Sequence, residues 1–111
     1  MEEESGFVKL FGDHPAVRVI DFLLTFREFD YSLTEIAENS GVAWSTIHSF
    51  FPHFVKLGIV VETRQIGRAR LYKLNVKNPV VQGMIALDNN LIHELADSVG
   101  KQEQIKTLSS N

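Results

Sequence analysis

The sequence predicts a mainly α-helical domain that contains one small β-hairpin. Three observations support this fold class. Apolar residues recur at helical spacing in three segments between residues 13 and 57, β-branched residues flank a glycine-containing turn between residues 59 and 76, and a long apolar stripe follows at residues 79–100. The chain of 111 residues has the length of one domain, and its 44% hydrophobic content is typical of a globular protein.

Residues 1–12 are expected to form an N-terminal arm or an edge strand. The run from Gly6 to Gly12 is apolar and bounded by glycines, and its pattern leaves both alternatives open. The acidic start lacks the features of a secretory signal, and no stretch has the length of a membrane span. The chain has no cysteine, which excludes disulfides and thiolate metal ligands and fits a cytoplasmic protein.

The first expected helix begins near Asp13 or His14 and runs to Glu28. Pro15 fits its first turn, where the missing amide hydrogen costs nothing. The polar residues of this segment form one narrow stripe: Arg18, Asp21, Thr25 and Glu28. A helix with so small a polar face should be largely buried or contacted from two sides.

Two shorter helices should follow. Ser32 and Glu35 have the spacing of a capping box, which predicts a helix over residues 33–39 after a connector at 28–31. A third helix should run from about residue 44 to Leu57 and end at a glycine. Pro52 lies inside it, so we expect one helix that bends near Phe51, with two helical pieces as the alternative.

The β-hairpin is expected from two segments rich in β-branched and aromatic residues, 59–64 and 71–76. Residues 65–70 should form its tip, where Gly67 can adopt the positive φ of a tight turn. These segments complete a unit that extends over residues 13–78.

The last helix should start after Asn78 and end at Gly100, followed by a flexible tail at residues 101–111. Its apolar stripe contains five large side chains: Val80, Met84, Leu87, Leu91 and Leu95. The stripe either folds back on the core of the same chain or pairs with a second copy. Because it exceeds what a small domain needs to cover, we expect a homodimer held by residues 79–100.

The charge is distributed unevenly along the chain. The net charge is −3, but residues 1–43 carry −6, residues 44–78 carry +5 and residues 79–111 carry −2. A phosphate backbone responds to the local patch rather than to the molecular total. The basic third of the chain is therefore the candidate for contact with nucleic acid.

A helix, a four-residue break with Gly41, a second helix and a basic hairpin form the order of a winged helix-turn-helix. Three segments carry the resemblance to a known family: Ser32–Ala37, Gly41–Ile47 and Phe54–Val60. They resemble winged-helix transcription regulators of the ArsR and MarR kind, with a likeness to short archaeal members. The resemblance covers residues 14–76. It implies a winged helix-turn-helix fold with a long C-terminal dimerisation helix, and double-stranded DNA as the partner.

The resemblance also implies roles by position. The third helix would be the recognition helix in the major groove, with these residues near the bases: Trp44, Ser45, Thr46, His48 and Ser49. The hairpin, or wing, would reach the backbone or the minor groove with four residues: Arg64, Gln65, Arg68 and Arg70. Arg68 and Arg70 have no obvious internal partner. Trp44 has two alternatives. It either stacks against sugars or contacts a thymine methyl of DNA, or it packs on Val42 or the start of its own helix.

The function that follows is a homodimeric, sequence-specific regulator of transcription. The alternative is a winged-helix module for protein contacts within a transcription or replication assembly. We expect no enzyme, cofactor or metal, because the sequence lacks a nucleophile motif, a phosphate-binding loop and paired metal ligands. A small-molecule effector is compatible with a dimer interface that contains Phe22, Phe26 and Met84, although the sequence names no ligand.

Overall fold

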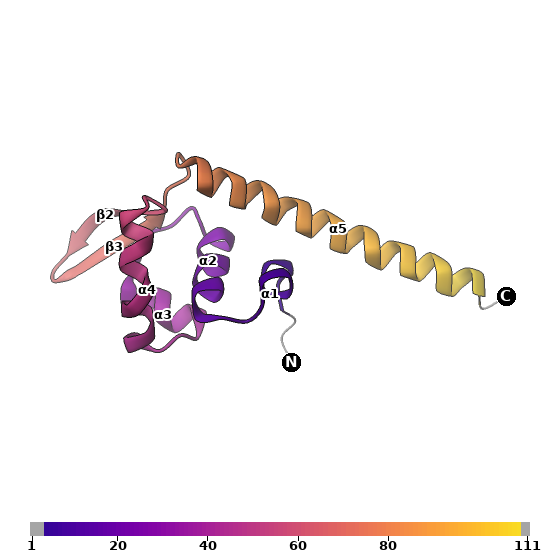
Figure 1. The fold of residues 1–111 in the computed structure, drawn as a ribbon, viewed down its shortest axis with the longest axis horizontal. Helices are drawn as coiled ribbons and strands as arrows, with labels where there is room; N and C mark the ends of the chain where they lie inside the picture. Colours follow the sequence, from indigo (N-terminus) through magenta and orange to yellow (C-terminus); the bar gives the residue numbers. More distant parts are fainter. Residues whose placement is uncertain (1–3, 110–111) are drawn as a thin grey trace.

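The computed structural model describes the backbone of residues 4–109 and the side chains of residues 4–97. The chain is mainly helical with a small antiparallel sheet, as the sequence predicts. A β-hairpin and the last helix leave the helical body in opposite directions (Figure 1), which gives the molecule a longest dimension of 64 Å. Among the described residues, no helix combines the length and apolar character needed to cross a lipid bilayer.

The N-terminal segment is a helix, α1 (Gly6–Phe11), so the expected edge strand is wrong. Ser5 caps it, since its hydroxyl accepts a hydrogen bond of 3.2 Å from the Val8 amide. The rings of Phe7 and Phe11 lie one helical turn apart, with centroids separated by 4.8 Å. The apolar positions of this run fit helical spacing rather than strand alternation, and Phe7 and Val8 are buried.

Three helices form the body: α2 (Pro15–Thr25), α3 (Leu33–Ser40) and α4 (Trp44–Lys56). Gly41 adopts a left-handed φ of 66° at the sharp turn between α3 and α4. The helices meet the sheet in one core. The largest fully buried side chains come from these three helices, the two hairpin strands and the last helix: Val19, Leu23, Leu24, Ile36, Ile47, Val60, Leu74 and Val81.

Helix α4 is continuous through Pro52, so the expected single helix is confirmed and the alternative of two pieces is wrong. The expected bend near Phe51 stays a prediction. Pro52 is exposed, while Ile47 and Phe51 on the other side are buried. An internal proline costs a helix about 3 kcal/mol. Burial of two large apolar side chains offsets that cost, at about 1.5–3 kcal/mol each.

The capping box at the start of α3 is confirmed. The Ser32 hydroxyl accepts from the Glu35 amide at 3.2 Å, and the Glu35 carboxylate accepts from the Ser32 amide at 2.9 Å. Replacing Ser32 with alanine should lower the free energy of unfolding by about 1 kcal/mol, because it removes one of these bonds. Urea denaturation measures the change. Ser45→Ala in α4 is the matched control, and an equal loss in both variants would contradict the prediction.

The sheet has three antiparallel strands in the order β1-β3-β2. The hairpin strands are β2 (Val60–Ile66) and β3 (Ala69–Leu74). Strand β1 (Tyr31–Ser32) lies where a connector was expected, and pairs with Tyr72 and Leu71 of β3. Two residues are too short to show a periodic pattern, so β1 is defined by its partner strand alone.

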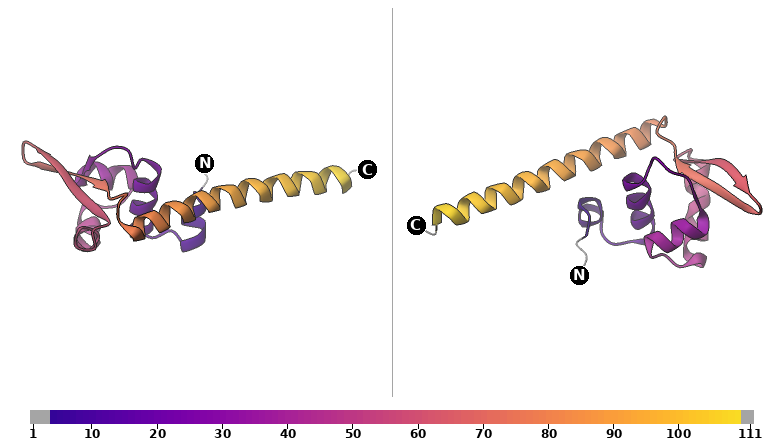
Figure 2. Two further views of the ribbon diagram at one scale, coloured as in Figure 1. Left: turned by 90° about the horizontal axis from the view of Figure 1, so that it is seen from above. Right: turned by 180° about the vertical axis from the view of Figure 1, so that it is seen from behind.

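The hairpin tip is shorter than expected. Ile66 pairs with Ala69, which leaves only Gly67 and Arg68 in the turn. Gly67 has the expected positive φ, 60°. The strands therefore extend farther from the body (Figure 2). Arg68 lies in the turn that joins them, at the end of the wing.

The last helix, α5 (Pro79–Ser109), is longer than the sequence predicts. The expected stop at Gly100 is wrong, because the helix continues to Ser109. The expected flexibility of residues 101–111 stays a prediction, and residues 110–111 lie outside the described residues. Glycine costs a helix only about 1 kcal/mol, and good helix formers follow it here, such as lysine, glutamine and glutamate.

The apolar stripe of α5 is divided between the core and the surface. Helix α5 contacts α1 and α2 of the same chain. Met84, Leu87 and Leu91 are half-buried against the core, whereas Val80 and Leu95 are exposed. Part of the stripe therefore packs on the core of the same chain, which is one of the two alternatives that the sequence left open.

Candidate nucleic-acid interface

The first turn of α4 and the tip of the hairpin flank one hollow of about 390 Å³. Trp44 lines it from α4, and Arg68, Ala69 and Arg70 line it from the wing. The hollow thus brings together three of the expected site residues: Trp44, Arg68 and Arg70. The other expected residues are not among those that line it: Ser45, Thr46, His48, Ser49, Arg64 and Gln65. Sequence reasoning missed the residues that complete the hollow, which belong to α3, β1 and β3: Ser32, Leu33, Thr34 and Tyr72.

The side chains expected at the reading face of α4 are accessible. Ser45, His48 and Ser49 are exposed, and Thr46 is half-buried. Trp44 is 51% exposed, so it is not a core residue, and its ring makes a T-shaped contact with the His48 ring at a centroid distance of 4.2 Å. The Ser49 hydroxyl already donates to the Thr46 carbonyl at 2.6 Å. Ser45 and His48 therefore offer the more available hydrogen-bonding groups.

The wing arginines differ in their partners. Arg64 donates from Nε and Nη2 to the two carboxylate oxygens of Asp30, at 2.9 and 3.2 Å. Arg70 lies 3.5 Å from the Glu62 carboxylate, so the expectation that it has no internal partner is wrong. Arg68 makes no ion pair within the described residues. The sequence could not show these pairings, because Asp30 is distant in the chain and Glu62 becomes a neighbour only through hairpin register.

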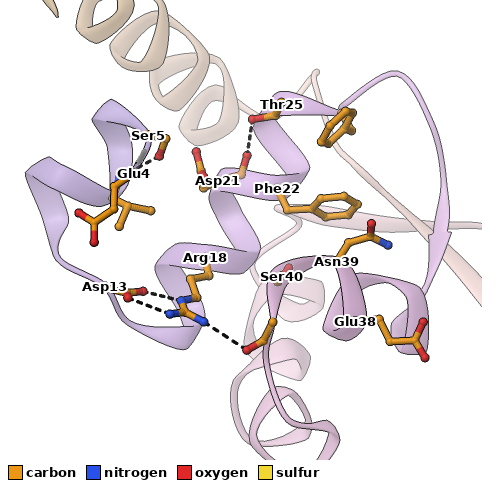
Figure 3. Close-up of a pocket in the computed structure, with 13 residues that line it drawn as sticks. Glu4, Ser5, Asp13, Arg18, Asp21, Phe22, Thr25, Glu38, Asn39 and Ser40 are labelled. Carbon is orange, nitrogen blue, oxygen red and sulfur yellow. Dashed lines mark hydrogen bonds and ion pairs between the residues drawn. The ribbon is translucent and has the colours of Figure 1, made fainter. Parts of the chain in front are cut away.

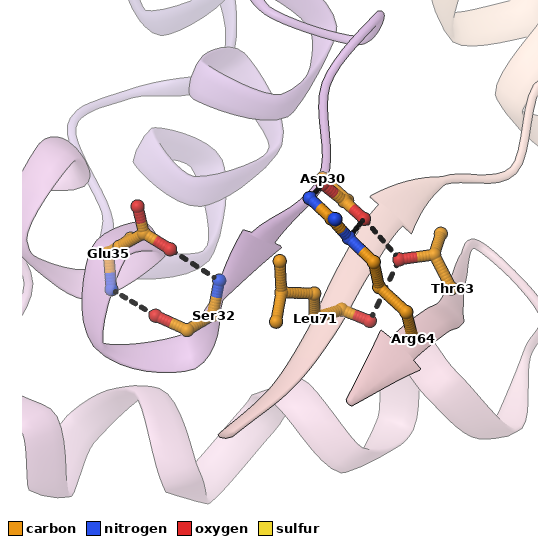
Figure 4. Close-up of polar contacts among 6 residues, drawn as sticks. All are labelled: Asp30, Ser32, Glu35, Thr63, Arg64 and Leu71. Atoms are coloured by element: carbon orange, nitrogen blue, oxygen red, sulfur yellow. Dashed lines mark hydrogen bonds and ion pairs between the residues drawn. The ribbon is translucent and has the colours of Figure 1, made fainter. Parts of the chain in front are cut away.

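Asp30 ties the loop before β1 to the base of the wing (Figure 4). Besides Arg64, it accepts a hydrogen bond of 2.5 Å from the Thr63 hydroxyl, at the bulge where β2 shifts register against β3. The hydrogen bonds from Arg64, first, and from Thr63 lower the pKa of the Asp30 carboxyl below its usual value. The guanidinium of Arg64 is correspondingly held in its charged form.

Asp30→Asn should make stability less sensitive to acid. A carboxyl with a lowered folded-state pKa stabilises the protein above its unfolded pKa of about 3.9, and this contribution is lost as pH falls through the folded value. Below about pH 4, the wild type should therefore lose stability more steeply than the variant. Denaturation at neutral and acidic pH measures this. Glu28→Gln, an exposed carboxylate outside the network, is the control; parallel curves for Asp30→Asn and wild type would contradict the prediction.

A larger cavity of about 820 Å³ lies between α1, α2 and the end of α3 (Figure 3). Phe22 and Phe26, two of the three residues expected near an effector, line it, but Met84 is not among its described lining residues. Arg18 forms a two-pronged ion pair with Asp13 and donates to the Gly41 carbonyl at 3.2 Å. Because its positive charge is already paired, the cavity presents mainly acidic groups.

Partial burial raises the pKa of the Asp21 carboxyl in this cavity. A hydrogen bond with the Ser5 side chain acts in the opposite direction, and the nearby charge of Asp88 on α5 raises the pKa further. Within the described part of the chain, no three histidine, aspartate or glutamate side chains are grouped as a metal site.

The helix-turn-helix α3–α4, followed by the β2–β3 wing and a long C-terminal helix, defines a winged helix-turn-helix fold. Comparison of the sequence with family models and with curated proteins finds no match. Solved structures match on fold. One is Lactococcus lactis ZitR, a C30AH42A mutant in apo form, with 17% identity, a TM-score of 0.63, and coverage of 95% of this chain and 86% of that one.

Two further structures extend the comparison. Sso10a-2, a DNA-binding protein from Sulfolobus solfataricus, matches with 13% identity and a TM-score of 0.51, over 82% of this chain and 92% of that one. Wild-type L. lactis ZitR in complex with DNA matches with 14% identity and a TM-score of 0.54, over 84% and 67%. At these identities the similarity shows the fold, which confirms the expected fold class.

Proposed function

We propose that the chain is a homodimeric regulator of transcription that binds double-stranded DNA in a sequence-specific manner. The recognition helix α4 enters the major groove, and the β2–β3 wing contacts the backbone or the minor groove. The main support is the single hollow shared by the exposed first turn of α4 and the Arg68 tip of the wing. The fold match to a protein solved in complex with DNA supports the same function.

The charges of α4 and the wing suggest different roles for the two elements in DNA binding. Residues 44–50 contain no lysine or arginine, so their exposed polar groups suit base edges better than phosphates. Arg68 is a permanent cation at the wing tip, which suits the negative backbone or a narrow minor groove. We therefore assign sequence preference chiefly to Ser45 and His48, and general affinity to the wing.

The exposed end of the α5 stripe supports the homodimer. Ile92 lies seven residues after Ile85 and eleven after Val81, which places all three on one side of the helix. Val81 is fully buried and Ile85 is half-buried, but Ile92, two turns after Ile85, is 58% exposed. Leu95 is 40% exposed beside it. A second α5 packed on this side would continue the burial that α2 and α1 begin.

Genomic DNA pull-down followed by sequencing tests the proposal. A two-fold dimer should enrich pseudo-palindromic sites whose halves lie one or more helical turns apart. Anisotropy titrations of a recovered duplex should show the logarithm of affinity falling with the logarithm of salt concentration, by about 0.9 per phosphate contact. Retention of random fragments only would contradict sequence specificity, and a salt-insensitive affinity would contradict the role of the wing.

A further inference from the structure

The hollow between α4 and the wing is lined by aromatic and basic side chains that the packing of the core does not need. Trp44 and Tyr72 line it with aromatic residues, Arg68 lines it with a cation that has no ion pair among the described residues, and Thr34 is a hydroxyl-bearing residue of its wall. Arg70 also lines it, but lies 3.5 Å from the Glu62 carboxylate. Large aromatic residues are usually well buried, yet Trp44 remains half exposed at this position. Aromatic surface flanked by cations suits a ligand with an apolar part and an anionic part.

The geometry of duplex DNA identifies such a ligand. The major and minor grooves are separated by one sugar–phosphate strand, so a rigid protein that inserts a helix in one groove and a wing in the next must be crossed by that strand. The hollow lies between these two elements. A deoxyribose offers an apolar face, and its phosphate carries the negative charge.

We infer that this hollow, which we call the backbone groove, receives one deoxyribose–phosphate unit of duplex DNA. The sugar packs on the Trp44 indole, and the phosphate lies towards Arg68 and Arg70. The inference rests on the proposed function and deepens it, because it makes Trp44 a contact to the backbone rather than a reader of bases. The His48 ring, which makes a T-shaped contact with Trp44 at a centroid distance of 4.2 Å, then restricts the orientation of the indole.

Trp44 is the only tryptophan of the chain, so its fluorescence reports on the backbone groove directly. Binding of a short duplex of random sequence to the full chain should change the Trp44 emission in parallel with the anisotropy of the labelled DNA. Ala69 also lines the hollow, and Ala69→Phe should block it without altering charge. This variant should lose duplex affinity, and the remaining binding should no longer change the emission.

Substitutions of Trp44 measure its contribution. Trp44→Ala should weaken binding about tenfold, because part of an aromatic surface is no longer covered by DNA, and the factor should be the same for different duplex sequences. Trp44→Phe should restore most of the affinity. Phe29→Ala is the matched control, since Phe29 is 61% exposed but does not line the hollow. Circular dichroism shows whether each variant keeps its fold.

Different results separate the inference from the proposed function. If no duplex binds by anisotropy, the proposed function fails and the inference fails with it. If duplex binds while the Trp44 emission stays constant, the proposed function stands and the backbone groove is overturned. A larger emission change with single strands than with duplex would also overturn it, because it indicates stacking of an unpaired base.

Discussion

Replacement of Ile92 with aspartate should convert the proposed dimer into a monomer at micromolar concentration. The variant places an unpaired charge where a second α5 is expected to cover the exposed apolar side of the helix, at a cost of several kcal/mol of association. Sedimentation velocity measures the change in mass. Because Ile92 is 58% exposed in the single chain, the substitution should leave the fold of each protomer intact.

Asn90→Asp is the matched control for this experiment. Asn90 is exposed and lies on nearly the opposite side of α5 from Ile92, so an added charge there should leave the dimer unchanged. Leu91 is a poorer test position, because it is half-buried against the core and close to Gly6 of α1. A wild-type monomer, or an unchanged dimer in Ile92→Asp, would contradict the prediction.

Arg68→Ala should weaken binding to specific and random duplexes by similar factors, about tenfold for removal of one charge-assisted hydrogen bond. The salt slope should fall by roughly one for each phosphate that the variant no longer neutralises. Arg68 makes no ion pair within the described residues, so its removal leaves no internal carboxylate unpaired. Titrations against a recovered duplex and a scrambled one, at two salt concentrations, measure both quantities.

Two further variants, Arg64→Ala in the wing and His48→Ala in α4, are the controls for the effect of Arg68→Ala on DNA binding. Arg64→Ala should weaken DNA binding less, because Arg64 is engaged by Asp30 in two hydrogen bonds. His48→Ala should relax sequence preference with a smaller decrease in affinity for random DNA. If Arg68→Ala changed neither affinity nor salt slope, the wing would not contact DNA, and a role in protein contacts would become the better hypothesis.

The sequence predicts most of the fold because its local signals agree with tertiary packing. Two examples are the Ser32–Glu35 capping box, which marks the start of a helix, and Gly67, whose residue type suits the positive φ of a tight turn. Strand β1 and the length of α5 escape prediction for opposite reasons. The first exists only through its pairing with β3, and the second continues through Gly100, a residue that usually ends a helix.

The sequence predicts which residue types form the candidate interface, but not which of these residues contact one another or their neighbours. Basic residues in the wing and hydroxyls at the start of α4 are visible in the chain. That Asp30 occupies Arg64, and that Ala69 and Thr34 share a hollow with Trp44, depends on the register of β3 against β1 and β2. Such contacts between distant segments carry no periodic signal.

Helix α1 packs against α5, and we expect this contact to influence the direction in which α5 projects. Gly6 permits this close approach, since a β-carbon there would lie 2.8 Å from the Leu95 side chain. At 1.5 Å per residue, α5 is about 46 Å long, so a tilt of about 10° at its base displaces the far end by about 8 Å. In the proposed dimer, that displacement is about a quarter of one DNA turn of roughly 34 Å. Removal of α1 should therefore change which operator spacing the two recognition helices accept, even though α1 packs on α2 and α5 rather than on the elements that would meet DNA.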